Sequence, residues 1–372
     1  MATGTAPAEP SAPRGSPDPG AAGRLLDRTG RISVTAVALV LAVHFLRPGW
    51  WDGHAPAVFV AGLAAGIPHG AVDHLVPAWC RSRGAHRRHR PLLPLGYVCA
   101  AAVAFALALW LPAPALCVFL ALSAVHFGRG ETCVNTLRAG AVPPPAGTLC
   151  TVAYGAVVTV LPLVRHPDAV RAFLHTLAPG ATWLLAAPVR PVATVLTATV
   201  ALAACALLLR HRRRRDAAEL LLLAALFWLV TPWVAFAVYF AAWHSLRHIA
   251  RLVLADPANR PALLAGHFGR PLRRFCRQGA LPTAVVLAAV AVTAHLGEPH
   301  RQALAGAGVA VLAALTLPHL LVVTLLDRHD AHEPSCADRS AGPGSPVRAG
   351  AVAPVVRAGE RGGACPSRAP RT

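Results

Sequence analysis

The sequence predicts an all-α polytopic membrane protein, a helical bundle with about ten transmembrane helices. Hydrophobic residues make up 55% of its 372 residues, and charged residues only 14%. The apolar residues form runs that recur along most of the chain, many of them near the roughly 20 residues that a helix needs to cross a bilayer. Basic residues gather in short blocks between these runs, a pattern typical of cytoplasmic loops.

The predicted spans are the successive apolar runs of the sequence. They cover roughly residues 32–46, 55–75, 92–111, 113–127, 148–164, 189–209, 281–295 and 303–326, with two more within 217–249. The run 217–249 is too long for one span, and Thr231-Pro232 is its expected break because proline ends a helix. Residues 168–177 look amphipathic and are expected at the membrane interface.

Both ends of the chain are polar and rich in Pro and Gly, which is typical of disorder. We therefore predict a disordered N-terminal tail over 1–28, a transmembrane catalytic domain over 29–327 and a disordered C-terminal tail over 328–372. Nine cysteines are scattered singly with no C-x-x-C pair, so neither a zinc ribbon nor a disulfide framework is indicated.

The loop charges predict an orientation in the cell membrane. With ten spans and a cytoplasmic N-terminus, the basic segments 81–90, 129–138, 210–215 and 251–277 all fall on the cytoplasmic side, as does the C-terminus. The net charge of +19 could suggest nucleic acid. Because the basic residues flank apolar runs, the expected partner is the lipid bilayer and no nucleic acid.

Histidines lie near the same end of three predicted spans. His69 and His74 lie near the end of the second span, His126 ends the fourth, and His244 and His248 end the eighth. In the predicted topology these ends all face the cytoplasmic leaflet. His244 and His248 are four residues apart, which puts them on one helix face, where two imidazoles can chelate one metal. Histidines in a span are costly unless they have a partner or a function.

The set His69, His126, His244 and His248 is therefore the predicted metal site. Its all-imidazole donors suit iron, zinc, copper or nickel. A zinc hydrolase is disfavoured because no hydrolytic partner set accompanies the histidines. A four-histidine iron site with open positions could bind O2 and serve an oxygenase. The alternatives are a histidine-lined membrane transporter, a metal- or haem-binding membrane protein without oxygenase activity, and a structural or assembly protein. A di-iron hydroxylase would need H-x-x-H-H boxes, which the sequence lacks.

Three motifs at these histidines carry a family resemblance. They are Pro68-His69-Gly70-Ala71-x-Asp73, Ser123-x-x-His126-Phe127-Gly128 and Trp243-His244-Ser245-x-Arg247-His248, with Pro318-His319 as a weaker fourth element. Over roughly residues 30–326 the chain resembles the Brp/Blh family of membrane β-carotene 15,15′-dioxygenases.

The resemblance implies a multi-span protein in which four histidines hold a non-haem Fe(2+) ion. By motif, these ligands carry over to His69, His126, His244 and His248. The implied reaction is cleavage of the central double bond of all-trans-β-carotene with O2, which gives two molecules of all-trans-retinal. The substrates are then β-carotene and O2, and an opsin that accepts the retinal stays an open partner. Beyond the metal ligands, no further catalytic side chain is expected.

Four polar residues are expected around the ligands. Asp73 either accepts the second N–H of a ligand ring or simply ends its helix. His74 lies five residues after His69, off its face. Arg247 is expected to reach a lipid phosphate or Asp73, and His319 either lies near the metal or is a helix-start histidine after Pro318.

A polyene substrate would partition into the bilayer and need an apolar tunnel beside the metal. Aromatic residues near the histidines are the candidates for its walls, with ordinary helix packing as the alternative: Phe127, Trp228, Trp233, Phe236, Tyr239, Phe240 and Trp243. Glu131 and Asp168 are expected to be loop carboxylates without a pair.

Overall fold

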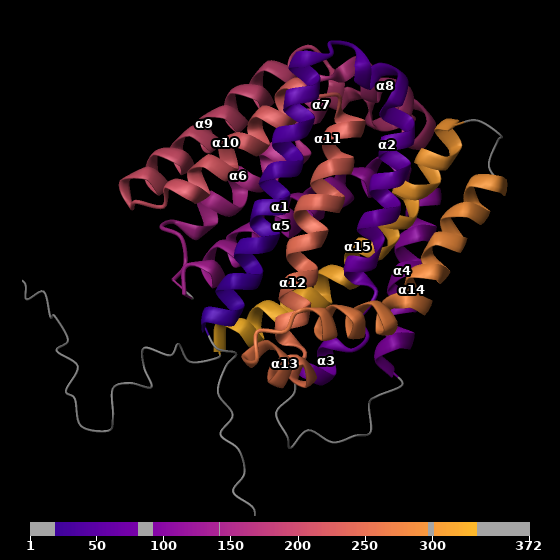
Figure 1. Cartoon of the computed structure of the whole chain (residues 1–372). Helices are drawn as coiled ribbons and strands as arrows, with labels where there is room; N and C mark the ends of the chain where they lie inside the picture. Colours follow the sequence, from indigo (N-terminus) through magenta and orange to yellow (C-terminus); the bar gives the residue numbers. More distant parts are fainter. Residues whose placement is uncertain (1–18, 81–91, 141, 297–300, 333–372) are drawn as a thin grey trace, which may run out of the picture. The chain divides into compact units, whose positions relative to one another are not determined.

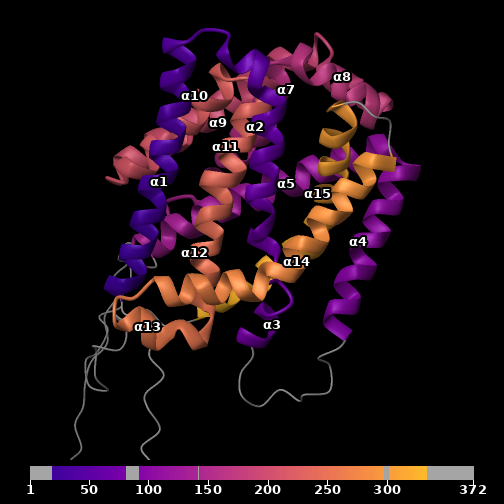
Figure 2. The same cartoon turned by 45° about the vertical axis from the view of Figure 1, so that its right-hand side comes forward.

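The computed structural model describes residues 19–80, 92–140, 142–296 and 301–332, and all secondary structure within them is helical (Figures 1 and 2). This confirms the all-α fold class. The first helix, α1 (Pro19–Leu46), begins before the predicted boundary at residue 29, and the last, α15 (Arg301–His332), continues past residue 327. The remainder of both predicted tails lies outside the described residues, so the domain division stays a prediction.

Five helices are long and apolar enough to cross a membrane. These stretches are Ala22–Leu46 in α1, Pro112–Arg138 (α5), Val189–Arg210 (α9), Gly269–Val292 in α14 (Gly269–Leu296) and Ala310–Arg328 in α15. Two shorter apolar stretches accompany them, Leu95–Trp110 in α4 (Leu92–Trp110) and Gly147–Thr159 (α6). The helices indicate a multi-pass membrane protein, whereas the count of ten spans stays a prediction.

The predicted second span, 55–75, is not one continuous helix. Helix α2 (Trp50–Gly66) passes into the 3-10 helix η1 (Ile67–Gly70), and a turn leads to the short α3 (Val76–Trp79). Pro68 lacks a backbone N–H and helps to end the α-helical pattern here. The irregular segment therefore carries His69 at the end of α2 rather than within a span.

The long run 217–249 breaks at the expected place. Helix α10 (Arg214–Leu229) ends before Thr231, and α11 (Pro232–Val238) begins directly after it. Helix α11 continues into the π-helix η4 (Tyr239–Ser245) and then α12 (Leu246–Ala255). A π-helix bonds i to i+5 and is often found at functional sites. His244 thus lies in a π-helical segment and not in the regular α-helix that its spacing suggests.

Helix α5 extends beyond the predicted end of the fourth span. It continues to Arg138, so Glu131 is helical and the expected loop starting at Arg129 is wrong over residues 129–138. Close packing against α6 supports this long helix. A Cβ atom at Gly128 would lie 2.0 Å from the Thr151 carbonyl oxygen, so only glycine permits this approach.

The remaining segments complete the bundle. They are α7 (Leu161–Arg165), α8 (Pro167–Leu177), η3 (Pro179–Leu185), η5 (Pro257–Asn259) and α13 (Arg260–Leu264). The main apolar core is built mostly from α1, α6, α9, α10 and α11, while α2 packs on α11 and α4 on α15 (Figure 2).

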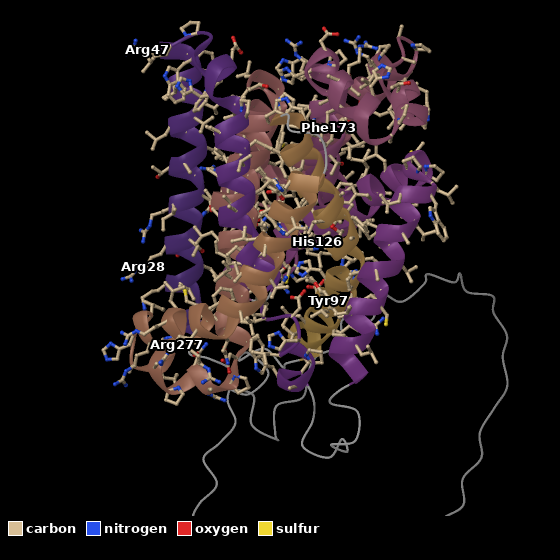
Figure 3. All side chains as sticks on the ribbon, turned by 90° about the vertical axis from the view of Figure 1, so that its right-hand side faces the viewer. Arg28, Arg47, Tyr97, His126, Phe173 and Arg277 are labelled. Carbon is tan, nitrogen blue, oxygen red and sulfur yellow. The ribbon has the colours of Figure 1, made fainter. Side chains whose placement is uncertain are left out.

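The described helices place His126 between the two ends of the bundle. In Figure 3, Arg277 lies near one end and Arg47 and Phe173 near the other, with His126 between them. Large apolar side chains on the long helices face outward, among them Leu202 on α9 and Val285 on α14. Outward apolar faces are expected for helices that contact lipid.

Candidate metal centre

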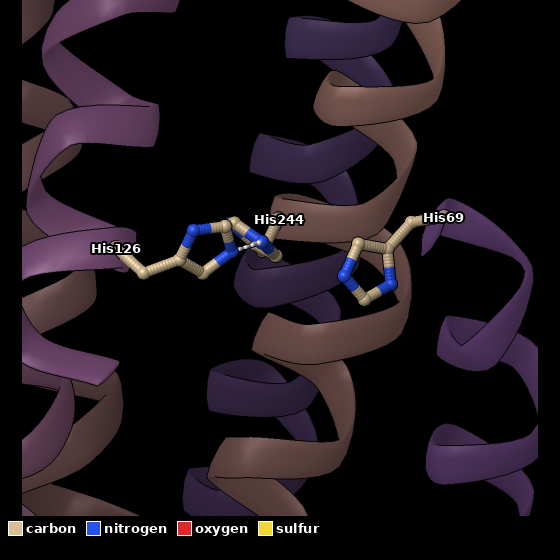
Figure 4. A group of neighbouring side chains, drawn as sticks. All are labelled: His69, His126 and His244. Atoms are coloured by element: carbon tan, nitrogen blue, oxygen red, sulfur yellow. Dashed lines mark hydrogen bonds between the residues drawn. The ribbon is translucent and has the colours of Figure 1, made fainter. Parts of the chain in front are cut away.

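Three buried histidines from separate segments meet in the helical bundle. His69 comes from η1, His126 from α5 and His244 from η4, and one ring nitrogen of each lies within 4.8 Å of the others. Figure 4 shows His69 and His126 approaching from opposite sides, with His244 between them. The structure thus brings together three of the four predicted ligands as a group that could hold a metal ion.

The ring of His69 is held in one orientation by the end of α2. Its Nδ1 lies 2.6 Å from the Gly66 carbonyl oxygen, which can only accept, so Nδ1 carries the proton. The Ser245 hydroxyl also donates to this carbonyl, at 3.1 Å. The proton on Nδ1 leaves the lone pair on Nε2 free for a metal, and a backbone acceptor behind the ring is usual for metal-bound histidines.

His126 and His244 meet through their Nε2 atoms, which lie 3.0 Å apart. In the absence of an ion, one ring must donate to the other. Two nitrogens bound to one ion at about 2.1 Å and at a right angle would also lie about 3.0 Å apart. The separation therefore fits two neighbouring ligands of one metal. The other nitrogen of His126, Nδ1, is buried without a hydrogen-bond partner.

The fourth predicted ligand, His248, lies beside this group. Its ring is nearly parallel to that of His244, with centroids 6.2 Å apart, and it contacts the ring of His69 at 5.7 Å. Its Nε2 is buried and has no hydrogen-bond partner. The i, i+4 pair is therefore together in space, with one member in η4 and the other in α12.

A fifth buried histidine, His319 on α15, completes the cluster. Its ring lies 4.9 Å from those of both His69 and His126. Its Nδ1 donates to Asp73 Oδ2 at 2.7 Å, and the Tyr97 hydroxyl donates to the same oxygen at 3.1 Å. Asp73 therefore accepts from a histidine ring, but that ring is not one of the four predicted ligands. His74, by contrast, is exposed and outside the cluster.

Arg247 points away from the histidines and does not reach lipid or Asp73. Only 1% of it is exposed, and its Nη1 lies 3.1 Å from Glu131 Oε2 and 2.9 Å from Glu219 Oε2. Its guanidinium lies 4.0 Å from the Trp243 ring centroid. The expected partners of Arg247 are therefore wrong, because helix α5 brings a carboxylate to this side of α12.

Glu131 is the residue that sequence reasoning missed. It was expected in a loop without a pair, yet it is buried, with 1% exposed. Besides Arg247 it accepts from the Trp243 indole N–H at 2.9 Å and from the Tyr239 hydroxyl at 3.3 Å. The signal that could have revealed it is the seven-residue spacing of the apolar Phe127 and Val134, which continues a helix face through Glu131.

An apolar cavity of about 250 Å³ borders the histidine cluster. His69, His126 and His319 form part of its wall, and the rest comes mostly from α4, α5, α14 and α15. Two of its lining residues, His74 and Val98, are exposed, so the cavity reaches the surface of the described bundle.

Three of the seven aromatic residues chosen for the tunnel line this cavity, namely Phe127, Phe236 and Phe240. The other four are not among its lining residues. Tyr239 and Trp243 direct their polar atoms to Glu131, and Trp233 packs against Phe59 and Phe173. Trp228 is exposed and lies under the guanidinium of Arg165.

The fold and the site together define a class of protein. It is a multi-helix membrane protein with a buried, all-imidazole group that could hold a transition metal, placed beside an apolar cavity. Imidazole donors without carboxylates or thiolates suit iron, zinc, copper or nickel.

Comparison with known proteins narrows this class to one family. A family described as "Beta-carotene 15,15'-dioxygenase" matches residues 60–327. The chain is 32% identical over 315 residues to the "Probable beta-carotene 15,15'-dioxygenase Blh" of Halobacterium salinarum (strain ATCC 700922 / JCM 11081 / NRC-1), a match that covers 80% of this chain and 90% of that protein. No solved structure matches. The chain belongs to the β-carotene 15,15′-dioxygenase family, and it is an enzyme of the oxygenase class.

Proposed function

We propose that this protein is an iron-dependent oxygenase that cleaves all-trans-β-carotene at the central 15,15′ double bond with O2, giving two molecules of all-trans-retinal. The observation that carries the proposal is the buried group of His69, His126 and His244 at the wall of an apolar cavity. Membership of the family and the name of the Halobacterium relative support β-carotene as the substrate.

The ligands proposed for Fe(2+) are His69, His126, His244 and His248. One ring nitrogen of each of the first three lies within 4.8 Å of the other two, and the buried Nε2 of His248 has no hydrogen-bond partner. When bound, iron would supply the redox chemistry that activates O2, while the protein binds and orients the substrate.

The volume of the cavity fits the middle of a polyene and not the whole molecule. At about 250 Å³ it is smaller than the pockets of about 300–1,000 Å³ that enclose drug-sized ligands. A C40 chain would therefore place its central bond beside the histidines and extend its ends out of the cavity. Phe127, Phe236 and Phe240 would hold the polyene by apolar contact and exclude water from the reacting bond.

The bilayer would supply this apolar substrate. We propose ten spans with both termini in the cytoplasm, supported by the five long apolar helices and the basic blocks between the apolar runs. Reporter fusions after each predicted span test this topology. A reporter that is active outside the cell when fused after residue 332 would contradict the cytoplasmic C-terminus.

The function is tested by expression in a host that makes β-carotene. We expect retinal by chromatography, loss of the orange colour and about one iron per purified chain. His248→Ala should abolish retinal formation and weaken iron binding, whereas His175→Ala, a change of an exposed histidine on α8, should preserve both. A wild-type protein that holds metal but makes no retinal would refute the proposal in favour of a metal- or haem-binding protein.

A further inference from the structure

We propose that His319 is a fifth metal ligand, oriented by Asp73, on the side of the histidine cluster that faces the cavity. The inference rests on the metal site proposed above and extends it. It concerns a residue that the four-histidine set leaves out and the part of the site where a molecule from the cavity would arrive.

The first support is the hydrogen bond behind the His319 ring. Its Nδ1–H donates to Asp73 Oδ2 at 2.7 Å, as the Nδ1–H of His69 donates to the Gly66 carbonyl at 2.6 Å. Metal-bound histidines almost always donate their second ring N–H to a carboxylate or a carbonyl, which fixes the tautomer and the ring plane. His319 therefore has the same hydrogen-bond pattern as His69, with the lone pair on Nε2.

The second support is the state of that Nε2 atom. It is buried and has no hydrogen-bond partner in the described structure, as is also true of His248 Nε2. Burying a polar atom without a partner is unfavourable, so such an atom calls for an explanation. A metal bound to Nε2 would supply the missing partner for both rings.

The third support is the arrangement of the five rings. Eight pairs of these rings have centroids 4.8–6.5 Å apart. The His319 ring lies 4.9 Å from those of His69 and His126 and 5.3 Å from that of His248. His319 therefore belongs to the same buried cluster as the proposed ligands.

Ring nitrogens of His69, His126 and His244 already lie within 4.8 Å of one another, whereas neither His248 nor His319 belongs to that group among the described residues. Ligands bound to one ion at about 2.1 Å lie at most about 4.2 Å apart, so His248 and His319 would both move closer to the other three when a metal binds.

The cavity is lined by His69, His126 and His319, whereas neither His244 nor His248 is among its lining residues. His319 therefore lies on the side of the cluster that faces the cavity. A small molecule or a double bond held in the cavity would approach a bound metal from this side.

The chain also fixes Asp73 in place. The Tyr97 hydroxyl donates to Asp73 Oδ2 at 3.1 Å from α4. A Cβ atom at Gly70 would lie 3.4 Å from His319 Nδ1 and 3.5 Å from Asp73 Oδ2, so glycine lets the pair pack closely against η1. Asp73 is thus a positioning residue, and His319 is the ligand that it orients.

A purely structural role for His319 would give the same Asp73 contact, so the test must count the ligands of the bound metal. We would load the detergent-solubilised full chain with Co²⁺ and count imidazole ligands by X-ray absorption. We expect five in the wild type and four in both His319→Ala and His319→Gln, of which the second keeps the side-chain bulk. His175→Ala is the matched histidine control and should keep five.

Asp73→Asn separates the positioning role from ligation. It should retain five imidazoles but bind Co²⁺ about 10–100-fold more weakly, because the ring loses its charged acceptor. Free imidazole should restore the wild-type cobalt spectrum of His319→Gly, which a structural role would not produce.

Unchanged imidazole counts and Co²⁺ affinity in both His319 variants would overturn the proposal while leaving the four-histidine site intact. A wild type that binds Co²⁺ through five imidazoles but makes no retinal when loaded with iron would refute the proposed function alone. A folded wild type that binds no Co²⁺ would overturn both.

Discussion

Replacing Arg247 by leucine is expected to destabilise the fold strongly, although Arg247 is not a proposed ligand. Its guanidinium is buried and contacts Glu131 and Glu219 at 3.1 and 2.9 Å. Leucine removes the positive charge and leaves both carboxylates in a low-dielectric interior. Breaking a buried ion pair in this way usually costs about 3–5 kcal/mol, because the remaining charge is left uncompensated.

The contacts decide how many charges are uncompensated. Glu219 keeps Arg138 at 2.7 Å and Arg215 at 3.1 Å, whereas Glu131 keeps the neutral donors Trp243 and Tyr239. Most of the loss therefore falls on Glu131. We expect the free energy of unfolding to fall by about 3–5 kcal/mol, and not by twice that amount.

The assay unfolds the purified protein in mixed micelles by adding denaturing detergent, and circular dichroism measures the loss of helix. A second change, Glu131→Gln, should restore about 2 kcal/mol in the Arg247→Leu background, because it removes the uncompensated charge and retains an acceptor for Trp243. In the wild-type background the same change should destabilise, because it removes a good ion pair.

Two results would refute this reasoning. The first is an Arg247→Leu protein within about 1 kcal/mol of the wild type, the value expected of an exposed pair. The second is strict additivity of the two changes, which would mean that Arg247 and Glu131 do not interact energetically.

Three further predictions concern packing and the metal. Gly128→Ala should destabilise the fold by about 1–3 kcal/mol in the same unfolding assay, because its Cβ would lie 2.0 Å from a carbonyl oxygen of α6. Gly147→Ala is the control and should be near neutral, because no atom lies within 4 Å of the added Cβ. Gly66→Ala would bring a Cβ within 2.2 Å of the Phe240 ring at the cavity wall. We expect retinal formation to fall more than the loss of folded protein alone explains. A fall in retinal that matches the loss of folded protein would argue against a shaped cavity. Removing the metal with a chelator should lower the melting temperature. Metal at about 100 times its Kd should restore about 2.7 kcal/mol of the free energy of unfolding. An unchanged melting temperature would contradict a structural link between the metal and the fold.

Much of the fold was predictable because it depends on local composition. The apolar runs predicted helices, and Thr231-Pro232 marked the break between α10 and α11, since proline cannot continue a helix. The ends of helices were less predictable. Helix α5 continues ten residues beyond Gly128, from Arg129 to Arg138, because the glycine packs against α6 rather than ending the helix, and this places Glu131 in the interior.

The site was predictable to the extent that it depends on residue type and spacing. The histidine motifs selected His69, His126 and His244, and the structure brings these three together. The aromatic residues near them could not be sorted by sequence. A π-helix turns Tyr239 and Trp243 toward Glu131, and only the neighbouring helices determine which rings face the cavity.

The sequence by itself determined that this is a helical membrane protein with histidines gathered near the ends of its apolar runs, because hydropathy and residue type are local properties of the chain. Only the tertiary structure decided which side chains share the site. His319 lies 246 residues from Asp73 and Arg247 lies 116 residues from Glu131, so no local pattern records either contact. Both follow from the tertiary packing of segments far apart in the sequence, which brings buried polar groups to the partners they require.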